Sequence, residues 1–418
     1  MDTATAILII GFAALAAAFC LLFIGLVYAE AMNSEIPPGI TNPGKLHALH
    51  CFIVGIAVLG RVFERLGLCS QVSFTRWCTG SLMALKRLPA PGLRIKDMTF
   101  SGVPVRVYEP TTASDQKRRG MMYFHGGGWV LGTIDLYDDI CRHIAKETDT
   151  TVVSVGYRLA PEHRFPAHLD DCEAATLHFL SVAKDEFGVD PGRVVLGGDS
   201  AGGNLTAALS QRLARKQAGH LPSPLALVLI YPALQMADFN LPSYQQNHAV
   251  PLLFRARTVF YFLQYLNGDM SVSQDVLAGR HIPAELKQHY KKWLDPAILP
   301  PEFRERCDQR PKQVATDHDG EVYHIIKDGL QPEFSPLLAE DDVLRLTPPT
   351  FILTCEYDVL RDDGFLFQKR LKDLGVDVTW HHLPDGFHGA FNFFSKRRMY
   401  FPTGERAMEQ VVSYIKGL

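Results

Sequence analysis

The sequence predicts an α/β fold, in which a mainly parallel sheet is covered by helices on both faces. Apolar runs with strand character alternate along the chain with segments of helical periodicity, a pattern typical of such sheets. One of these runs ends in glycines around Ser200 and continues directly as a helix, which places a serine at the edge of the sheet. More than a hundred residues separate Tyr231 from Phe351, and a connection of that length in a compact domain predicts an inserted cap.

Length and composition fit one large domain. The chain has 418 residues, of which 47% are hydrophobic, so it can bury one large α/β core together with an inserted or appended cap. A formal net charge of -3 with mixed signs gives no basic face, so nucleic acid is not expected as a partner. The eight cysteines are scattered without a CxxC pair or a zinc-type spacing, so no metal site is predicted.

The first thirty residues predict a membrane-spanning helix. Residues 3–29 carry no charged side chain, and a bilayer core needs roughly 20 apolar residues in helical form. The alternative is a cleaved signal peptide, because residues 29–31 imitate a cleavage site. The long apolar stretch and the lack of an early basic residue favour an uncleaved anchor over residues 4–28. Since the first basic residue is Lys45, charge hardly indicates an orientation.

A second apolar run covers residues 51–60 and is too short to cross a bilayer. We interpret it as a buried helix of the cap. The alternative is an interfacial segment that rests on the membrane near the active-site mouth. Because the sequence up to Leu85 also has helical character, residues 35–90 are assigned to an N-terminal part of the cap.

Eight runs are predicted as strands, and the first two are expected to form an antiparallel pair. The runs are residues 93–95, 103–108, 121–124, 151–157, 194–196, 225–231, 351–355 and 378–383. Residues 91–234 and 346–418 therefore form the predicted catalytic domain, and residues 235–345 form the cap insertion. The first half of the insertion is rich in aromatic residues and is predicted to be helical. These aromatic side chains are expected to pack inside the cap at least as much as to contact a substrate. The second half is rich in proline and charge and predicts irregular surface.

The chain around Ser200 predicts a nucleophile on a sharp turn. The motif GDSAGG occupies residues 198–203, and glycines flank the serine because a sharp turn crowds side chains against the backbone. A second motif, HGGGW at residues 125–129, follows the strand at 121–124. Its bare backbone amides can stabilise an oxyanion. His125 precedes the serine in the chain and is expected to hold this glycine loop by hydrogen bonding rather than to act as a base.

These two motifs, with YRLAPEHRFPA between them at residues 157–167, resemble those of the hormone-sensitive-lipase-like branch of the α/β-hydrolases. Within that branch the chain is most similar to the arylacetamide deacetylase group, over nearly its whole length. The resemblance implies the α/β-hydrolase fold, a short cytoplasmic N terminus and a catalytic domain in the lumen of the endoplasmic reticulum, as in a single-pass type II membrane protein. The motifs are specific for the family and weakly specific for the substrate.

The acid of a catalytic triad should follow the serine in the chain and precede the histidine. Asp358 stands just past the end of the predicted strand at 351–355, where such an acid is needed, and it matches the family's motif. Glu356 is the competitor. Asp362 and Asp363 fit better as the first residues of a helix.

Sixteen histidines are present, so most of them must have other roles. His381 and His382 lie within the last predicted strand, where side chains are committed to packing or to the sheet face. His388 lies beyond that strand in a glycine-flanked loop that can bend back over Ser200, and it is assigned as the base.

The predicted mechanism is acyl transfer in two steps. His388 takes the proton of Ser200 as the hydroxyl attacks an ester or amide carbonyl, while Asp358 orients the imidazolium. Water then releases the acyl group, and no metal or cofactor is needed. The oxyanion is expected to be received by the backbone amides of Gly126, Gly127 and Ala201.

Two functions from different classes remain. The first is a membrane-anchored serine carboxylesterase, lipase-like or deacetylase-like, acting on apolar or lipid esters. The second is a catalytically silent lipid-binding protein on the same fold. All three triad positions are occupied, which favours the enzyme. Two structural expectations accompany it: Cys355 is a core residue, and the sequon at Asn204 is buried and unmodified.

Overall fold

The computed structural model describes residues 3–83, 90–112, 118–216, 222–306, 318–396 and 399–418. Its centre is one eight-stranded sheet with the order β1-β2-β4-β3-β5-β6-β7-β8. Strand β2 pairs antiparallel with β1 and β4, and all later neighbours pair in parallel. The strands are β1 (Leu93–Phe100), β2 (Val103–Pro110), β3 (Arg118–Phe124), β4 (Thr151–Val155), β5 (Val189–Asp199), β6 (Ala226–Ile230), β7 (Thr350–Tyr357) and β8 (Val378–Phe387).

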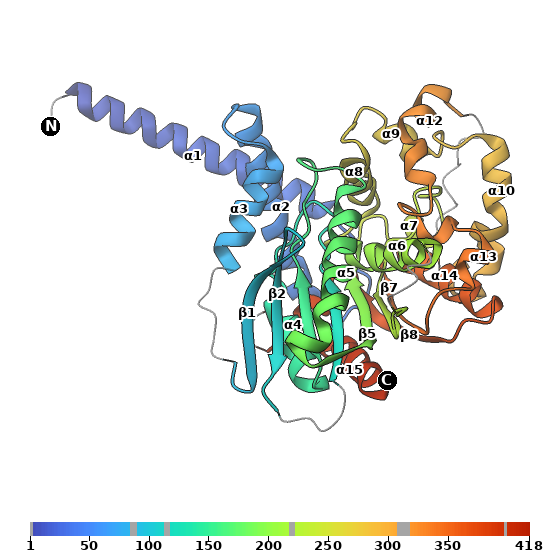
Figure 1. The fold of residues 1–418 in the computed structure, drawn as a ribbon. Helices are drawn as coiled ribbons and strands as arrows, with labels where there is room; N and C mark the ends of the chain where they lie inside the picture. Colours follow the sequence, from blue (N-terminus) through green and yellow to red (C-terminus); the bar gives the residue numbers. More distant parts are fainter. Residues whose placement is uncertain (1–2, 84–89, 113–117, 217–221, 307–317, 397–398) are drawn as a thin grey trace.

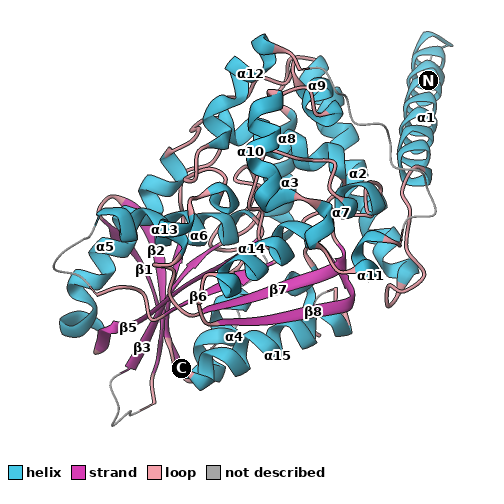
Figure 2. Cartoon of the chain, turned by 90° about the vertical axis from the view of Figure 1, so that its right-hand side faces the viewer, coloured by secondary structure: helices cyan, strands magenta, loops and turns pink. Residues whose placement is uncertain are grey.

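Each predicted strand run falls on one of these strands, and the predicted α/β-hydrolase fold is confirmed. The central strands β4 and β6 are buried along their whole length, as expected for parallel strands covered on both faces. Helices α4 (Asp138–Thr148) and α15 (Pro402–Gly417) pack on one face of the sheet. The other face is covered by α5 (Ala167–Phe187), α6 (Ala201–Lys216) and α14 (Arg361–Asp373), as Figure 2 shows. Cys355 is fully buried in the first of these cores, as expected.

The insertion between β6 and β7 forms a helical layer over the carboxyl ends of the strands (Figure 1). Its aromatic side chains pack inside the cap and against the catalytic domain. Tyr265 stacks on Phe334 of the cap, with ring centroids 4.7 Å apart, and on Trp129 of the glycine loop, with ring centroids 4.4 Å apart. The second half contains short helices as well as irregular chain, and its charge-rich residues 307–317 lie outside the described residues. The α-helices of the insertion are α7 (Pro242–Gln246), α8 (Arg255–Leu266), α9 (Ser273–Ala278), α10 (Ala284–Leu294), α11 (Pro301–Arg304), α12 (Gly320–Ile326) and α13 (Asp341–Leu344). Short 3₁₀ helices are η1 (Pro296–Ile298), η2 (Lys327–Leu330) and η3 (Pro336–Leu338), and η4 (Ala390–Phe393) follows β8.

The N-terminal region forms three helices. Helix α1 (Thr3–Met32) has 30 residues and extends away from the rest of the chain in both overall views (Figures 1 and 2). Helices α2 (Pro43–Arg65) and α3 (Gln71–Met83) pack on each other beside the catalytic domain. The predicted N-terminal helix is therefore present as a helix.

The apolar run at residues 51–60 belongs to a longer helix than the sequence suggested. Within the part of the chain that the structure describes, α2 is the helix with the length and composition to cross a membrane: it has 23 residues and includes an 18-residue window with a mean hydropathy of 1.8. The prediction that this segment is too short to cross was therefore wrong. One side of α2 is buried, however, since Leu46 packs into a small apolar core with Phe387 and Phe401 of the catalytic domain.

Candidate active site

Ser200 occupies a sharp turn between β5 and α6. Its backbone φ is 56°, in the left-handed region that non-glycine residues rarely adopt. A Cβ at Gly202 would lie 1.8 Å from the carbonyl oxygen of Phe124, and one at Gly198 would lie 2.3 Å from the same oxygen. The glycines at both positions are thus required by the close approach of strand β3, and the turn holds the serine at the carboxyl edge of the sheet.

The structure brings together the three side chains that the sequence singled out as a triad. Nε2 of His388 lies 2.9 Å from Oγ of Ser200, and Nδ1 of His388 lies 2.8 Å from Oδ2 of Asp358. The other carboxylate oxygen of Asp358 accepts a hydrogen bond from the amide of Leu360 at 2.8 Å. Asp358 is fully buried, while Ser200 and His388 are 8% and 9% exposed. The arrangement can relay a proton from the hydroxyl and leaves a small opening for a substrate.

The competing acid, Glu356, has other partners. Its carboxylate forms ion pairs with Arg306 and Arg361, and its Oε2 lies 2.9 Å from Nε2 of His382. Burial acts to raise the pKa of Glu356, but the hydrogen bond with His382 and the two guanidinium groups lower the pKa overall. His382 lies within β8, as predicted. Glu356 therefore belongs to a structural ion-pair cluster.

The glycine loop is held by Asp199, the residue before the serine. Its buried carboxylate accepts hydrogen bonds from the hydroxyls of Tyr123 at 2.8 Å and Tyr137 at 3.2 Å, and from the amide of Gly126 at 3.0 Å. Burial raises the pKa of Asp199, partly offset by these three donors. Sequence reasoning missed this role, because nothing local marks a residue between a strand and a serine as the partner of a distant loop.

The amide of Gly126 is therefore occupied, and the prediction that it receives the oxyanion is wrong for this conformation. The next two glycines have positive φ values, 110° for Gly127 and 63° for Gly128. Within the described residues their amides and that of Ala201 donate no hydrogen bond in the chain. These three amides are therefore backbone donors of the two motifs that remain open to an oxyanion.

His125 holds the glycine loop, as expected. Nδ1 of His125 lies 2.8 Å from the carbonyl oxygen of Gly126. The hydroxyl of Tyr157 donates a hydrogen bond to the carbonyl oxygen of His125 at 2.6 Å. Burial lowers the pKa of His125 to about 4, so the ring is neutral near pH 7. Asn204, in the sequon, is also buried, and its side chain donates to the carbonyl oxygens of Ala233 and Phe334.

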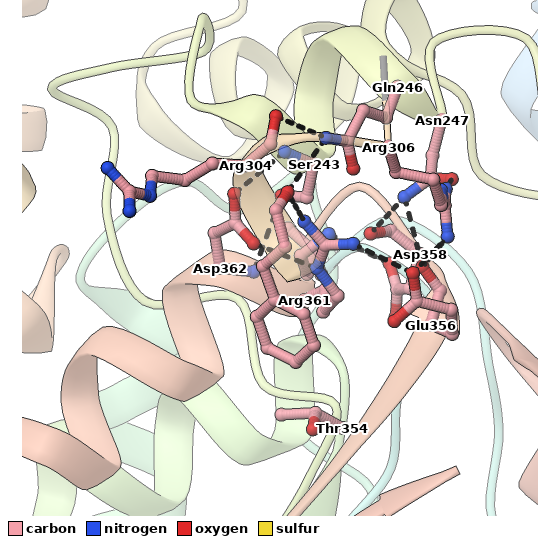
Figure 3. A network of polar contacts seen from close by, with 12 residues as sticks. Ser243, Gln246, Asn247, Arg304, Arg306, Thr354, Glu356, Asp358, Arg361 and Asp362 are labelled. Atoms are coloured by element: carbon pink, nitrogen blue, oxygen red, sulfur yellow. Dashed lines mark hydrogen bonds and ion pairs between the residues drawn. The ribbon is translucent and has the colours of Figure 1, made fainter. Parts of the chain in front are cut away.

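Polar side chains of the cap insertion hold the turn that carries Asp358 (Figure 3). Nδ2 of Asn247 donates to the carbonyl oxygen of Asp358 at 2.9 Å, and Arg306 donates to Oδ1 of Asn247 at 2.5 Å. Ser243, on α7, donates to the carbonyl oxygen of Val359 at 2.6 Å. The sequence carried no signal for Asn247 and Ser243, because Asp358 and Val359 lie more than a hundred positions away in the chain.

Asn247→Ala is expected to lower kcat about fivefold with little change in KM, because it frees the backbone of the Asp358 turn without touching a substrate. The lost hydrogen bond is worth about 1 kcal/mol, and a tenfold rate change is 1.4 kcal/mol. Gln245→Ala is the matched control, since the Gln245 side chain donates to Asn240 at 2.7 Å within the cap. Steady-state kinetics of both variants check the prediction, which fails if the two variants behave alike.

Comparison with known proteins agrees with this geometry. A family model described as alpha/beta hydrolase fold matches residues 121–287 and 313–392. Arylacetamide deacetylase-like 4 of Homo sapiens is 41% identical over 397 residues, covering 95% of this chain and 96% of that protein. Neutral cholesterol ester hydrolase 1 of Pongo abelii is 36% identical over 411 residues, covering 96% and 98%.

Among solved structures, an esterase of Pyrobaculum calidifontis superposes with a TM-score of 0.61 at 27% identity, covering 86% of this chain and 97% of its own. Both curated relatives align over nearly their full length, so the likeness includes the N-terminal helices as well as the sheet. The chain therefore belongs to the arylacetamide deacetylase and deacetylase-like group of the α/β-hydrolases, and it is a carboxylic-ester hydrolase.

Proposed function

We propose that this protein is a membrane-anchored serine esterase that hydrolyses apolar or lipid esters. The observation that carries the proposal is the continuous hydrogen-bonded chain from Ser200 through His388 to Asp358. A serine hydroxyl is a weak nucleophile until a base within hydrogen-bond reach removes its proton, and the base needs a third group to fix its tautomer. Both conditions are met in one buried cluster.

In the first step the hydroxyl of Ser200 attacks the ester carbonyl carbon while His388 takes the proton. The carboxylate of Asp358 stabilises the imidazolium, which then returns the proton to the departing alcohol. In the second step a water molecule, activated by His388, releases the acid and restores the serine. The oxyanion of both tetrahedral intermediates is received by the amides of Gly127, Gly128 and Ala201, and losing one such donor costs about 2.7–4 kcal/mol.

Two apolar side chains of the cap support an apolar acyl group. A Cβ at Gly128 would lie 2.4 Å from the ring of Tyr261, and one at Gly389 would lie 3.8 Å from Leu252. The insertion therefore brings apolar surface next to the oxyanion amides and next to the loop of His388. A relative named as a cholesterol ester hydrolase supports a lipid ester as one substrate class.

The membrane anchor of this proposal is α1. Described side chains on several sides of it are exposed, among them Ile10, Phe12 and Leu21, and such a helix suits lipid on all sides. By analogy with the family, the catalytic domain faces the lumen of the endoplasmic reticulum. Protease protection of the catalytic domain in sealed microsomes tests this orientation, and digestion without detergent would contradict it.

A fluorophosphonate probe tests the catalytic part of the proposal. The wild-type protein in detergent is expected to be labelled covalently, and Ser200→Ala is expected to lose the label while keeping its thermal unfolding temperature. A folded wild-type protein that takes up no label would instead favour the silent lipid-binding protein. A series of nitrophenyl esters then measures acyl-chain preference, and a preference for charged, water-soluble esters would count against lipid substrates.

A further inference from the structure

We infer that the tip of the α2–α3 pair is seated in the lipid bilayer, as a second membrane contact beside α1, and that it brings the catalytic opening to the membrane surface. This inference rests on the proposed membrane anchor and deepens it. We call the residues concerned the apolar tip. It consists of Phe63, Leu66, Leu68, Phe74 and Trp77.

The apolar tip is unusually exposed for a water-soluble surface. Leu66, Leu68 and Trp77 are 67%, 64% and 67% exposed, and the ring of Phe74 lies between those of Phe63 and Trp77. Among the described residues after α3, the only exposed large apolar side chains are Leu346 at 59% and Met399 at 38%, and they stand apart in the chain. Exposed apolar side chains gathered in one place mark a surface that another apolar phase covers.

The helices around the apolar tip favour lipid as the phase that covers it. The apolar tip begins in the last turn of α2, and the C-terminal part of α1 contacts the same helix, where Phe23 and Val27 lie within 4.0 Å of the Cβ position of Gly55. A helix that lies beside a membrane anchor and is itself apolar enough to enter lipid brings the chain at its end to the same bilayer. Tryptophan at the edge of such a surface and charged Arg65 next to it suit the boundary between lipid and water.

The same two helices hold both sides of the catalytic site. On one side, Nε of Arg76 in α3 donates to the carbonyl oxygen of Val130, next to the glycine loop, at 2.8 Å. On the other side, Leu46 of α2 packs with Phe387 and Ala390, which flank His388 in the chain. Thr41, just before α2, also donates to Asp385 at 2.8 Å. Seating the apolar tip in lipid would therefore fix the opening of the site at the surface from which an apolar ester leaves the bilayer.

The test uses the full chain in phospholipid vesicles, where α1 keeps every variant on the membrane. Leu68→Glu is expected to lower kcat/KM at least tenfold for a long-chain ester dissolved in the vesicle bilayer, and to leave kcat/KM for nitrophenyl acetate in the water phase within twofold. Leu346→Glu is the matched control, since Leu346 is 59% exposed and lies in the chain just before β7. It should leave both activities unchanged. Equal bilayer activities of the two variants would overturn the inference.

A second measurement does not depend on catalysis. Brominated phospholipids are expected to quench part of the tryptophan emission of the wild-type protein, and Trp77→Phe should remove that part. Of the other three tryptophans, Trp129 and Trp293 are buried, and Trp380 is partly buried on β8 of the catalytic sheet. Identical quenching in both proteins would overturn the inference. A third result would also overturn the inference: Leu68→Glu keeps its bilayer activity but no longer forms a cross-linked dimer that the wild-type protein forms. That result would assign the apolar tip to contact with a second copy of the chain. Failure of the proposed esterase function is distinguishable, since the wild-type protein would then hydrolyse neither ester.

Discussion

Asp358→Asn is expected to lower kcat about 10⁴-fold while the protein stays folded, because an amide at this position favours the wrong tautomer of His388. The carboxylate is fully buried and accepts from Nδ1 of His388, so the proton on the other ring nitrogen is absent and Nε2 can accept from Ser200. Asparagine has nearly the same shape but can offer an N–H to Nδ1, which would leave the proton on Nε2 and block that role. KM should change little, since Asp358 does not reach the substrate.

Glu356→Gln is the control that separates the two candidate acids. Glu356 lies two residues earlier, near the end of β7, but its carboxylate is held by Arg306, Arg361 and His382. The Glu356→Gln substitution should lower kcat less than tenfold, and its main effect should be a lower unfolding temperature. Kinetics on a nitrophenyl ester and thermal unfolding of both variants give the comparison. If Glu356→Gln were the inactive variant and Asp358→Asn the active one, the triad assigned here would be wrong.

The strands and the triad were predictable because their signals are local or fixed in order. A buried parallel strand needs a continuous apolar run, and β4 and β6 supply one each. The histidine was found because it follows the last strand in a loop with glycine on both sides. The order of serine, acid and histidine along the chain then left few choices for the acid, and the hydrogen bonds of His388 select Asp358.

Other features depend on partners far away in the chain, and no local pattern predicts them. Three successive glycines look alike as a sequence, but only Gly126 meets the carboxylate of Asp199, 73 residues later. Asn247 is an ordinary polar residue until the cap brings it to the turn of Asp358. The length of α2 was underestimated because its first turns contain Lys45 and two histidines. Those turns are helical in the structure, where Leu46 and Leu49 are buried.

Asp199→Ala is expected to have the largest combined effect on stability and rate outside the triad. The substitution leaves three buried donors without an acceptor, the hydroxyls of Tyr123 and Tyr137 and the amide of Gly126. Each such loss costs about 1–3 kcal/mol, so the free energy of unfolding should fall by several kcal/mol. The glycine loop would also lose the contact that fixes the amides of Gly127 and Gly128, and kcat should fall about 10²- to 10³-fold, as when an oxyanion donor is lost.

Tyr137→Phe separates the two effects, because it removes one donor together with its hydrogen bond and leaves the bond between Gly126 and Asp199 in place. It should lower the unfolding temperature slightly and change kcat less than tenfold. Asp199→Asn is intermediate: the amide has the same volume and one acceptor oxygen, so it can hold Gly126 but not both tyrosines. The expected order of kcat is wild type, Tyr137→Phe, Asp199→Asn, Asp199→Ala. An alanine variant with the kcat of the wild type would mean that the glycine loop keeps its position through His125 and Tyr157 alone.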